Sequence, residues 1–290
     1  MSDSLKPKAQ SPKPSPKAQS PKPSPLPADY HIHTAWCGHA SGSMEEYVLR
    51  AIELGLPEMG FSEHLPQPVP IPDKVAPTAD EMEQFIDEFA SLRKAYAGRM
   101  TIRLGGEADF TPGSAQAIER MKRDYGLEYV IGSVHFLGGW ALDHPAYQDG
   151  FAARSVDAAY GEYFEMIREA AGTGLFDVIG HLDLPKKFGH RPDTSVVKLA
   201  EKSIEAMAAN GVGFEINTAG RDKPVGEFYP SRELIVACRE AGLRLTFGSD
   251  SHRPTEVGRY FREASELARE CGYKHTMRMS PGREAVEIRG

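Results

Sequence analysis

From residue 29 onward, the chain alternates short β-branched or apolar runs with amphipathic segments of helical period. This alternation is typical of a parallel β/α architecture, in which a helix follows each strand and covers the sheet. Seven strands are predicted, near residues 29–33, 57–61, 101–107, 129–135, 176–181, 212–217 and 244–249. Seven such units favour a (β/α) barrel with seven strands where eight are usual. A doubly wound open sheet is the competing arrangement, because periodicity does not distinguish the two.

Two of the predicted helices have a clear start. Ser43 with Glu46, and Thr78 with Glu81, have the spacing of a capping box, in which each residue's side chain accepts a hydrogen bond from the other's backbone amide. Further helices are predicted near residues 113–124, 156–172, 195–210, 231–241 and 257–271.

The first 28 residues have a different character. The nonapeptide Lys-Ala-Gln-Ser-Pro-Lys-Pro-Ser-Pro occurs at residues 8–16 and again, unchanged, at 17–25. The segment has no apolar periodicity, and its prolines favour an extended, solvated chain. We therefore expect residues 1–28 to be a disordered tail rich in Lys, Pro and Ser, and residues 29–290 to form the folded domain.

Charge and composition limit the partners and the location of the protein. The net charge is −7, and the tail carries five lysines and one aspartate, so the predicted domain is more acidic than the whole chain. An acidic domain disfavours nucleic acid as a partner. No apolar run is long enough for a transmembrane helix, so no membrane partner is expected. The three cysteines form no Cys-x-x-Cys motif, which favours a reducing cytoplasm. The sequence predicts no oligomeric state.

Residue types that bind metals recur where the predicted strands end. His31 and His33 lie at positions i and i+2 of the first strand and so point to the same face. The carboxyl ends of parallel barrel strands converge on one mouth, where active sites are built. The candidate donors at these strand ends, or in the loops that follow them, are His31, His33, His39, His64, Glu107, His135, His181, Asp250 and His252. We expect all nine to meet at that mouth.

Nine nitrogen and oxygen donors exceed what one ion can use. They predict two or three divalent ions of the zinc, iron or manganese kind. No thiolate belongs to the set, which disfavours a purely structural zinc site. Glu107 and Asp250 each offer two carboxylate oxygens and can bridge two ions. Clustered ions of this kind are suited to phosphoryl transfer.

The order and spacing of these donors resemble the motifs of the polymerase and histidinol phosphatase (PHP) superfamily over almost all of residues 29–252. Within it, residues 180–189 (Gly-His-Leu-Asp-Leu-Pro-Lys-Lys-Phe-Gly) and 215–221 (Glu-Ile-Asn-Thr-Ala-Gly-Arg) are similar to the histidinol-phosphate phosphatases of histidine biosynthesis. The resemblance implies a distorted (β/α)7 barrel, a TIM-like barrel of the PHP type, with a trinuclear metal centre. The basic N-terminal repeat has no counterpart in this family pattern.

The resemblance also implies how the donors divide among the ions. One ion would be held by His31, His33, Glu107 and Asp250, a second by Glu107, His135 and His181, and a third by His39, His64 and His252. Glu107, Asp250 and His252 would act in catalysis through the hydroxide that the ions generate from water.

The implied substrate is a small phosphomonoester, most simply L-histidinol phosphate. Two or three dications would neutralise its phosphate dianion and lower the pKa of a bridging water. Arg221 is the first candidate for the non-bridging oxygens because guanidinium matches phosphate in bidentate fashion, and Lys186, Lys187 and Arg253 are further candidates. Phe136 and Trp140 are candidates for an aromatic wall, and Asp143 for a carboxylate that accepts the amine.

Other functions stay open at this point. A nuclease or other phosphodiesterase of the same superfamily, or a phosphatase of another small phosphorylated metabolite, would share the metal set. A non-catalytic interaction module is disfavoured by nine intact donors. Cys238 and Arg244 have the Cys-x5-Arg spacing of cysteine-dependent phosphatases, but here the cysteine ends a helical pattern and the arginine begins a strand, the reverse of that motif.

Overall fold

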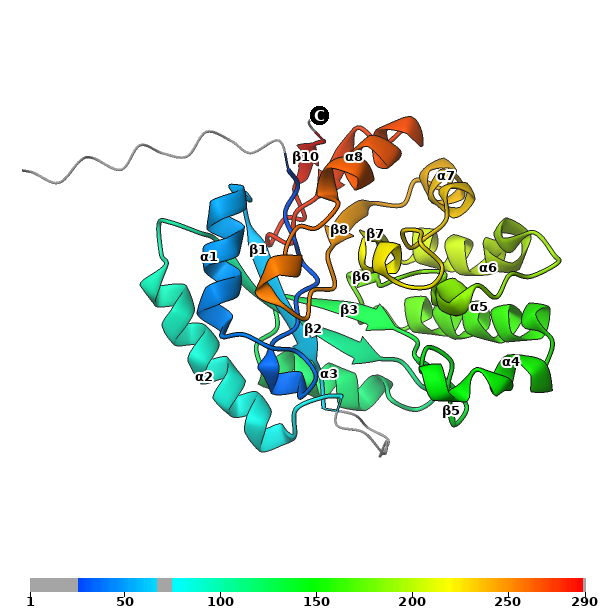
Figure 1. Cartoon of the computed structure of the whole chain (residues 1–290), viewed down its shortest axis with the longest axis horizontal. Coiled ribbons are helices and arrows are strands. Elements are labelled where there is room, and N and C mark those ends of the chain that lie inside the picture. The colour runs from blue at the N-terminus through cyan, green and yellow to red at the C-terminus, as the bar shows by residue number, and fades with distance from the viewer. Residues whose placement is uncertain (1–25, 67–74, 289–290) are drawn as a thin grey trace, which may run out of the picture.

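The computed structural model describes residues 26–66 and 75–288. Its main sheet has six parallel strands in the order β1-β2-β3-β6-β7-β8 (Figure 1). Their bounds are β1 Met59–His64, β2 Ile102–Asp109, β3 Tyr129–Ser133, β6 Val178–Ile179, β7 Gly213–Asn217 and β8 Leu245–Gly248. Each neighbour in the sheet is the next of these strands along the chain. This sequential order is that of a barrel, since a doubly wound sheet reverses its strand order partway.

The segment predicted as the first strand lies between the two edges of this sheet. The Asp29 carbonyl accepts a hydrogen bond from the Gly60 amide of β1 (2.8 Å), and the His33 amide donates to the Ser251 carbonyl beyond β8 (2.9 Å). Residues 29–33 form only isolated bridges, so they are not a regular strand as predicted. The pairing is irregular because this segment contacts a different edge of the sheet on each of its two sides, and each contact extends over only a few residues. They nevertheless complete a seven-membered, distorted barrel, which confirms the predicted fold class.

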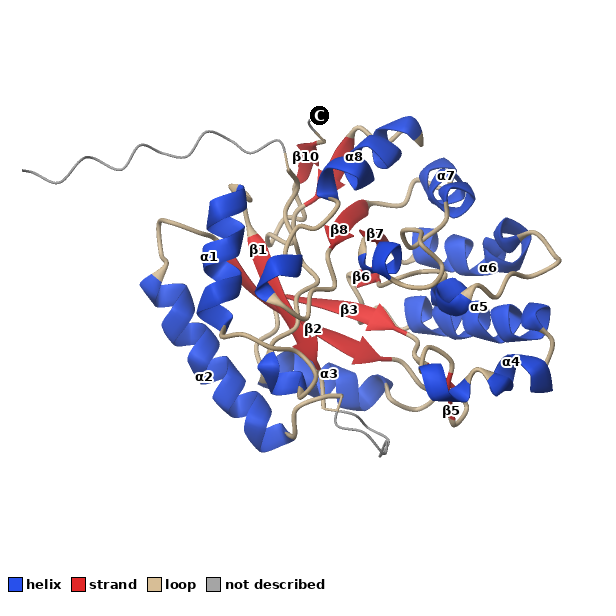
Figure 2. Cartoon of the chain, in the orientation of Figure 1, coloured by secondary structure: helices blue, strands red, loops and turns tan. Residues whose placement is uncertain are grey.

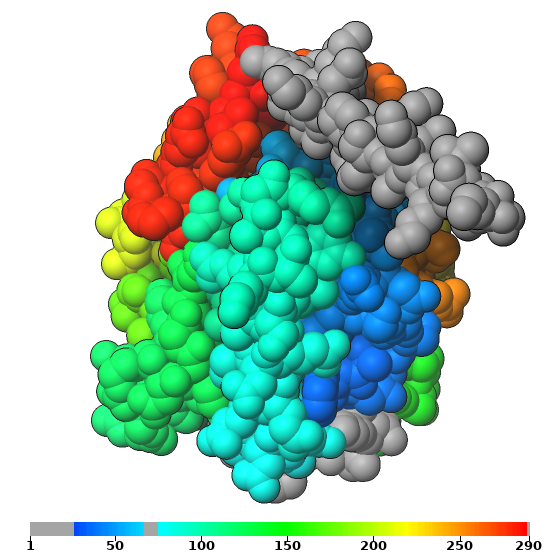
Figure 3. Space-filling model, turned by 90° about the vertical axis from the view of Figure 1, so that its left-hand side faces the viewer, coloured from blue at the N-terminus to red at the C-terminus, as the bar shows by residue number. Residues whose placement is uncertain are grey.

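Helices cover the outside of the curled sheet (Figure 2). They are α1 Met44–Leu54, α2 Ala79–Ala95, α3 Ala115–Asp124, the short α4 Asp149–Ala153, α5 Val156–Gly172, α6 Val196–Ala209, α7 Arg232–Glu240 and α8 Phe261–Glu270. Figure 3 shows α2 crossing one face of the molecule, with α1 on one side of it and α3 on the other. Both predicted capping boxes are present, at Ser43 and Thr78. Helix α8 begins four residues later than predicted, because Gly258 and Tyr260 have positive φ values of 65° and 56° and turn the chain first.

Two short hairpins were not predicted. Strands β4 Phe136–Leu137 and β5 Trp140–Ala141 pair after β3, and β9 His275–Met277 pairs with β10 Ala285–Glu287 near the C-terminus. Short 3-10 turns follow several strands: η1 Ala35–Cys37, η2 Pro145–Tyr147, η3 Leu184–Phe188, η4 Ala219–Asp222 and η5 Pro254–Glu256. These connections lie at the carboxyl ends of the strands, where they can surround a site.

The predicted N-terminal tail falls almost entirely outside the described residues, so its disorder stays a prediction. The boundary differs by a few residues: Ala28 is buried in an apolar cluster with Tyr30 and Tyr129, so packed structure begins before residue 29. Across residues 26–66 and 75–288, no helix has both the length and the apolar character needed to cross a membrane.

Candidate metal centre

The nine predicted donors meet at the carboxyl ends of the strands. Seven of them line a cleft of about 430 Å³: His39, His64, Glu107, His135, His181, Asp250 and His252. His31 and His33 lie beneath it and are fully buried. The convergence predicted from strand-end positions is therefore present in the structure.

Glu107, at the end region of β2, lies at the centre of the cluster. Its Oε2 is 3.0 Å from His64 Nδ1 and 3.4 Å from His33 Nε2. Its Oε1 is 3.1 Å from His181 Nε2 and accepts a hydrogen bond of 2.6 Å from the Ser133 hydroxyl. Burial alone would raise the pKa of Glu107, but the surrounding histidines outweigh it and hold this pKa well below its usual range. Glu107 is thus an ionised carboxylate shared by several imidazoles.

Asp250 approaches the same imidazoles from the loop after β8. Its Oδ1 lies 3.3 Å from His33 Nε2 and 3.8 Å from His31 Nε2. Asn217 Nδ2 donates to its Oδ2 at 3.3 Å, which holds the carboxylate from the side of β7. Although burial opposes ionisation, the charge of His31 and the hydrogen bond with His33 keep the pKa of Asp250 well below its usual range.

Among the described residues, four overlapping groups could each hold a metal ion, because the ligand atoms within each group lie within 4.8 Å of one another. They are His31, His33 and Glu107; Glu107, His135 and His181; His33, His64 and His252; and Cys37, His39 and His252. The first two groups match the implied sets for the first and second ions, with Asp250 beside the first.

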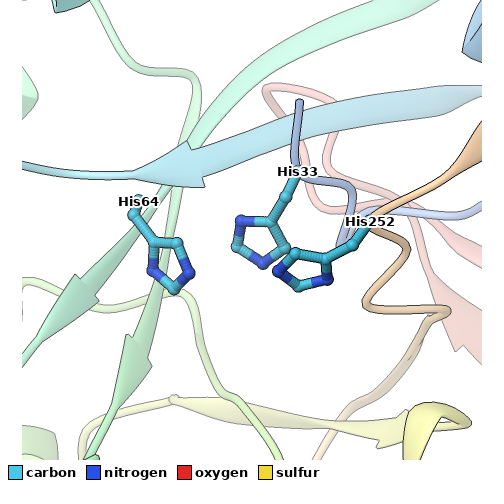
Figure 4. Close-up of side chains that lie close together, drawn as sticks. All are labelled: His33, His64 and His252. Atoms are coloured by element: carbon cyan, nitrogen blue, oxygen red, sulfur yellow. The ribbon is translucent and has the colours of Figure 1, made fainter. Parts of the chain in front are cut away.

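The third implied set is arranged differently. His252 gathers with His64 and His33, whose three rings approach one another from separate segments (Figure 4). His39 joins through a contact of 2.8 Å between its Nε2 and that of His252, next to the Cys37 sulfur. The Cys37 thiol was not predicted as a donor. Burial raises its pKa to about 12, so it is a neutral thiol at pH 7.

Two carboxylates, Glu215 and Asp109, orient histidines from behind, and a third, Glu63, lies near His33 Nδ1, which has no hydrogen-bond partner among the described residues; none of the three was predicted. Glu215 on β7 lies 2.9 and 3.0 Å from His31 Nδ1, Asp109 on β2 lies 2.6 Å from His135 Nδ1, and Glu63 on β1 lies 3.5 Å from His33 Nδ1. When Nδ1–H donates to such a carboxylate, the Nε2 lone pair is left facing the cluster, as in metal-binding histidines. An acidic residue inside a buried, otherwise apolar strand was the available signal.

A glycine allows the approach of Glu215 to His31. A Cβ atom at Gly248 would lie 2.3 Å from Glu215 Oε2 and 2.6 Å from His31 Cβ. Any side chain there would separate the carboxylate from the imidazole that it orients. Gly248 is therefore required by close packing rather than by its backbone angles.

The donor set fits divalent cations. Imidazole nitrogens face one another at 3.1 Å between His31 and His33 Nε2, and at 3.2 Å between His135 and His181 Nε2. The buried Nδ1 of His181 has no hydrogen-bond partner. Histidine nitrogens mixed with carboxylate oxygens, without a thiolate, are typical of zinc, iron and manganese sites. A divalent cation at this position could be bound by these facing nitrogens.

The predicted substrate residues divide into two groups. Phe136, Asp143, Lys187 and Arg253 line the cleft. Lys187 Nζ donates to Asp143 Oδ2 at 2.9 Å. Burial opposes ionisation of Asp143, but the Lys187 charge dominates and lowers its pKa to about 2. These four residues lie where a substrate would enter.

The other three candidates lie elsewhere. Lys186 is buried, and its Nζ donates to the Phe228 carbonyl (2.7 Å) and pairs with Asp183 (2.9 Å). Adjacent lysines on the tight turn η3 point in different directions, which is why only Lys187 reaches the cleft. Trp140 donates its Nε1–H to the Tyr147 carbonyl (2.8 Å).

Arg221 lines a separate depression with Arg191 and Arg232. Its guanidinium lies 5.7 Å from the ring centroid of Phe228. The turn η4 carries it away from the cluster, a direction that strand position does not predict. The structure instead adds cleft residues that were not predicted, among them Tyr147, Lys223 and Arg259.

Comparisons with known proteins agree with the resemblance to the PHP superfamily. Residues 29–219 match the family described as the PHP domain. The chain is 39% identical to a Deinococcus radiodurans protein named "Probable histidinol-phosphatase", over 84% of this chain and 93% of that protein.

Two solved structures share the fold. One, from Listeria monocytogenes, has a TM-score of 0.75 at 25% identity and covers 81% of this chain and 99% of that one. The other is a histidinol phosphate phosphatase from Lactococcus lactis in complex with zinc, L-histidinol and phosphate; it has a TM-score of 0.73 at 21% identity and covers 90% of this chain and 98% of that one. The family match over residues 29–219, together with a relative at 39% identity, places this chain in the PHP domain family.

Proposed function

We propose that this protein is a metal-dependent histidinol-phosphatase that hydrolyses L-histidinol phosphate to L-histidinol and phosphate in histidine biosynthesis. The observation that carries the proposal is the buried cluster centred on Glu107, in a chain 39% identical to a relative that bears this name. The three cysteines are buried and free, which supports the reducing cytoplasm as its location.

Two or three divalent ions, zinc, iron or manganese, are proposed for this cluster. His31, His33, Glu107 and Asp250 would hold one, Glu107, His135 and His181 a second, and His64 and His252 with His39 a third. When bound, such ions supply charge that neutralises a phosphate dianion and lowers the pKa of a water molecule.

The chain's own residues hold and orient these groups. Glu215 and Asp109 fix the tautomers of His31 and His135, so that the Nε2 lone pairs face the cluster. Glu107, Asp250 and His252 are the residues that we propose for the chemical step. Glu107 and Asp250 supply negative charge at fixed positions. Burial and the charge of His33 lower the pKa of His252 to about 2, so its imidazole is neutral at pH 7.

The cleft above the cluster suits a small substrate with an amine and an imidazole. We propose that Lys187 and Arg253, with Lys223, attract the phosphate, since all three line the cleft. Asp143 is ionised at neutral pH and can accept a hydrogen bond from the amine of histidinol. Phe136 and Tyr147 offer apolar surface for the imidazole ring.

The test is a substrate panel with the full chain and added zinc, iron or manganese. It compares L-histidinol phosphate with sugar monophosphates, nucleotide monophosphates and single-stranded DNA. We expect kcat/KM to be highest for L-histidinol phosphate, by roughly a hundredfold, since matched polar contacts discriminate strongly. The D250A variant, which we expect to fold and to be inactive, is the control for contaminating phosphatases.

Two results would count against the proposal. A higher kcat/KM for another monophosphate or for DNA would show that L-histidinol phosphate is not the preferred substrate. Less than one metal ion per chain, measured on protein purified without chelators, would contradict a metal-dependent mechanism.

A further inference from the structure

Arg259 lies just before helix α8, and its guanidinium donates hydrogen bonds to the backbone that carries Asp250. Its Nε and Nη2 donate to the Ser249 carbonyl at 3.1 and 2.9 Å, and Nη2 also donates to the Asp250 carbonyl at 3.1 Å. Its Nη1 donates to Asp222 Oδ2 at 3.0 Å. The side chain is only 13% exposed. A planar guanidinium fork can grip two neighbouring carbonyls in this way, whereas a lysine ammonium cannot reproduce the geometry.

The same backbone is held from its amide side. Asp29, fully buried, accepts the Ser249 amide on Oδ1 and the Gly258 amide on Oδ2, both at 3.0 Å. The His252 amide, two residues after Asp250, donates to Glu256 Oε2 at 2.8 Å. Glu256 Oε1 in turn lies 3.5 Å from Arg259 Nη1. The loop is thus tied down at Ser249, Asp250 and His252 by charged side chains.

The Asp250 backbone needs such support because its φ is 49°, in the left-handed region. For a residue other than glycine this conformation is uncommon and persists when surrounding contacts determine it. It directs the Asp250 carboxylate toward His33, at 3.3 Å. If the loop relaxed, the carboxylate would be the first donor of the cluster to move.

We propose that Arg259 is a positioning residue, which fixes the Ser249–Asp250 backbone so that the Asp250 carboxylate stays in the cluster. Loss of the guanidinium fork lowers the affinity for the ion that Asp250 would hold. This role rests on the proposed metal centre. It is distinct from phosphate binding, although Arg259 also lines the cleft, because its donors already serve two carbonyls and Asp222.

The test measures zinc affinity by competition with a chromogenic chelator, without substrate, for the wild type, R259K and R259Q. We expect affinity at the weakened site to fall by about 10- to 100-fold in both variants, as for other residues that orient ligands. With saturating zinc, kcat should recover most of its value and KM for L-histidinol phosphate should stay within about twofold.

R283K is the matched control. Arg283 is also mostly buried (19% exposed) and donates to the Ser280 and Glu128 carbonyls and to Asp177, but it lies away from the cluster. It should lose thermal stability without a change in zinc affinity. D222N weakens one of the Arg259 contacts, together with the hydrogen bond that Asp222 accepts from the Tyr260 hydroxyl. It should lower zinc affinity by a few fold and serves if the Arg259 variants do not fold.

The outcomes separate this role from the proposed function. Unchanged zinc affinity in R259K, or in D222N if R259K is unfolded, overturns the positioning role while the metal centre stands. A raised KM with unchanged zinc affinity makes Arg259 a phosphate ligand instead. A wild type that binds no zinc overturns the metal centre, and the positioning role with it.

Discussion

The floor of the cleft and its rim are built differently. The floor consists of His31, His33, Glu107, His181 and Asp250, and the first four are at most 2% exposed. Strand ends or the segments directly attached to them supply these residues. Hydrogen bonds with Glu215, Ser133 and Asn217 orient His31, Glu107 and Asp250, respectively. The fold itself therefore fixes the charges and lone pairs on which the proposed chemistry depends.

The rim consists of Phe136, Asp143, Tyr147, Lys187 and Arg253, from the hairpin and turns above the sheet. Tyr147 is 44% exposed and the Arg253 side chain 71%. Residues held this loosely can adapt to a substrate, whereas displaced floor residues would lose the site. The difference indicates that floor substitutions act on metal binding and turnover, and rim substitutions on KM.

The largest effect is expected for E107Q. Glutamine keeps the shape of the side chain but removes the charge that His31, His64 and His181 share. We expect kcat/KM for L-histidinol phosphate to fall by more than about 100-fold. That value is the upper end of the range for substitutions of residues that only orient metal ligands. Metal analysis of the same sample should show fewer ions per chain.

Circular dichroism provides the folding control for E107Q. If this variant kept as many ions per chain as the wild type and more than a tenth of the wild-type rate, the proposed role of the floor in metal binding and turnover would be wrong.

E215Q tests whether the floor depends on the carboxylates behind it. The glutamine amide can turn its N–H toward His31 Nδ1. That nitrogen would then accept a hydrogen bond, and the proton would move to Nε2, which could no longer bind a metal ion. We expect zinc affinity and kcat/KM to fall by about 10- to 100-fold.

E58Q is the matched control for E215Q. Glu58 is also buried, but it bonds with Tyr30 and Arg103 outside the cluster. It should reduce stability only. Equal zinc affinity in E215Q and E58Q would contradict an orienting role for Glu215.

The metal cluster should also show a pH dependence that the rim lacks. Burial lowers the pKa of His33 and of His135, but Asp250 and Glu63 raise the first to about 9, and Asp109 raises the second to about 10. Without ions, both imidazoles are protonated at pH 7. Each proton must leave before the nitrogen can bind, so zinc affinity should rise about tenfold per pH unit for each proton released.

Chelator competition between pH 7 and 9 measures this effect, and a flat profile would contradict it. Stability changes in the opposite direction in the ion-free protein. A raised histidine pKa stabilises the fold below about pH 6.5, and that contribution is lost as the pH rises through 9 to 10.

The floor could be predicted from the sequence, whereas the rim could be predicted only in part. Strand-end position alone brought His31, Glu107 and Asp250 to one mouth, because parallel strands fix where their ends point. Glu215 and Asp109 were missed because a second-layer carboxylate has no spacing motif of its own. Residues 29–33 were predicted as a regular strand, since local pattern does not reveal that two partners share them.

Rim residues depend on turn geometry, which periodicity does not encode. Lys186 and Lys187 are adjacent in sequence, yet one is buried against Asp183 and the other faces the cleft. Arg221 was the first choice for phosphate because it follows a strand, but η4 turns it toward Phe228.

The smallest effect separates these two cations. In K187M the cleft loses a positive charge whose attraction for phosphate, at a partly exposed position, is about 1 kcal/mol, or roughly fivefold in KM. R221A should change KM by less than twofold, because its guanidinium lines another depression. Steady-state kinetics with saturating metal measure both, and neither variant should alter zinc affinity. If R221A raised KM more than K187M did, the η4 turn would have to move Arg221 toward the cleft when substrate binds, and the rim would extend further than the structure indicates.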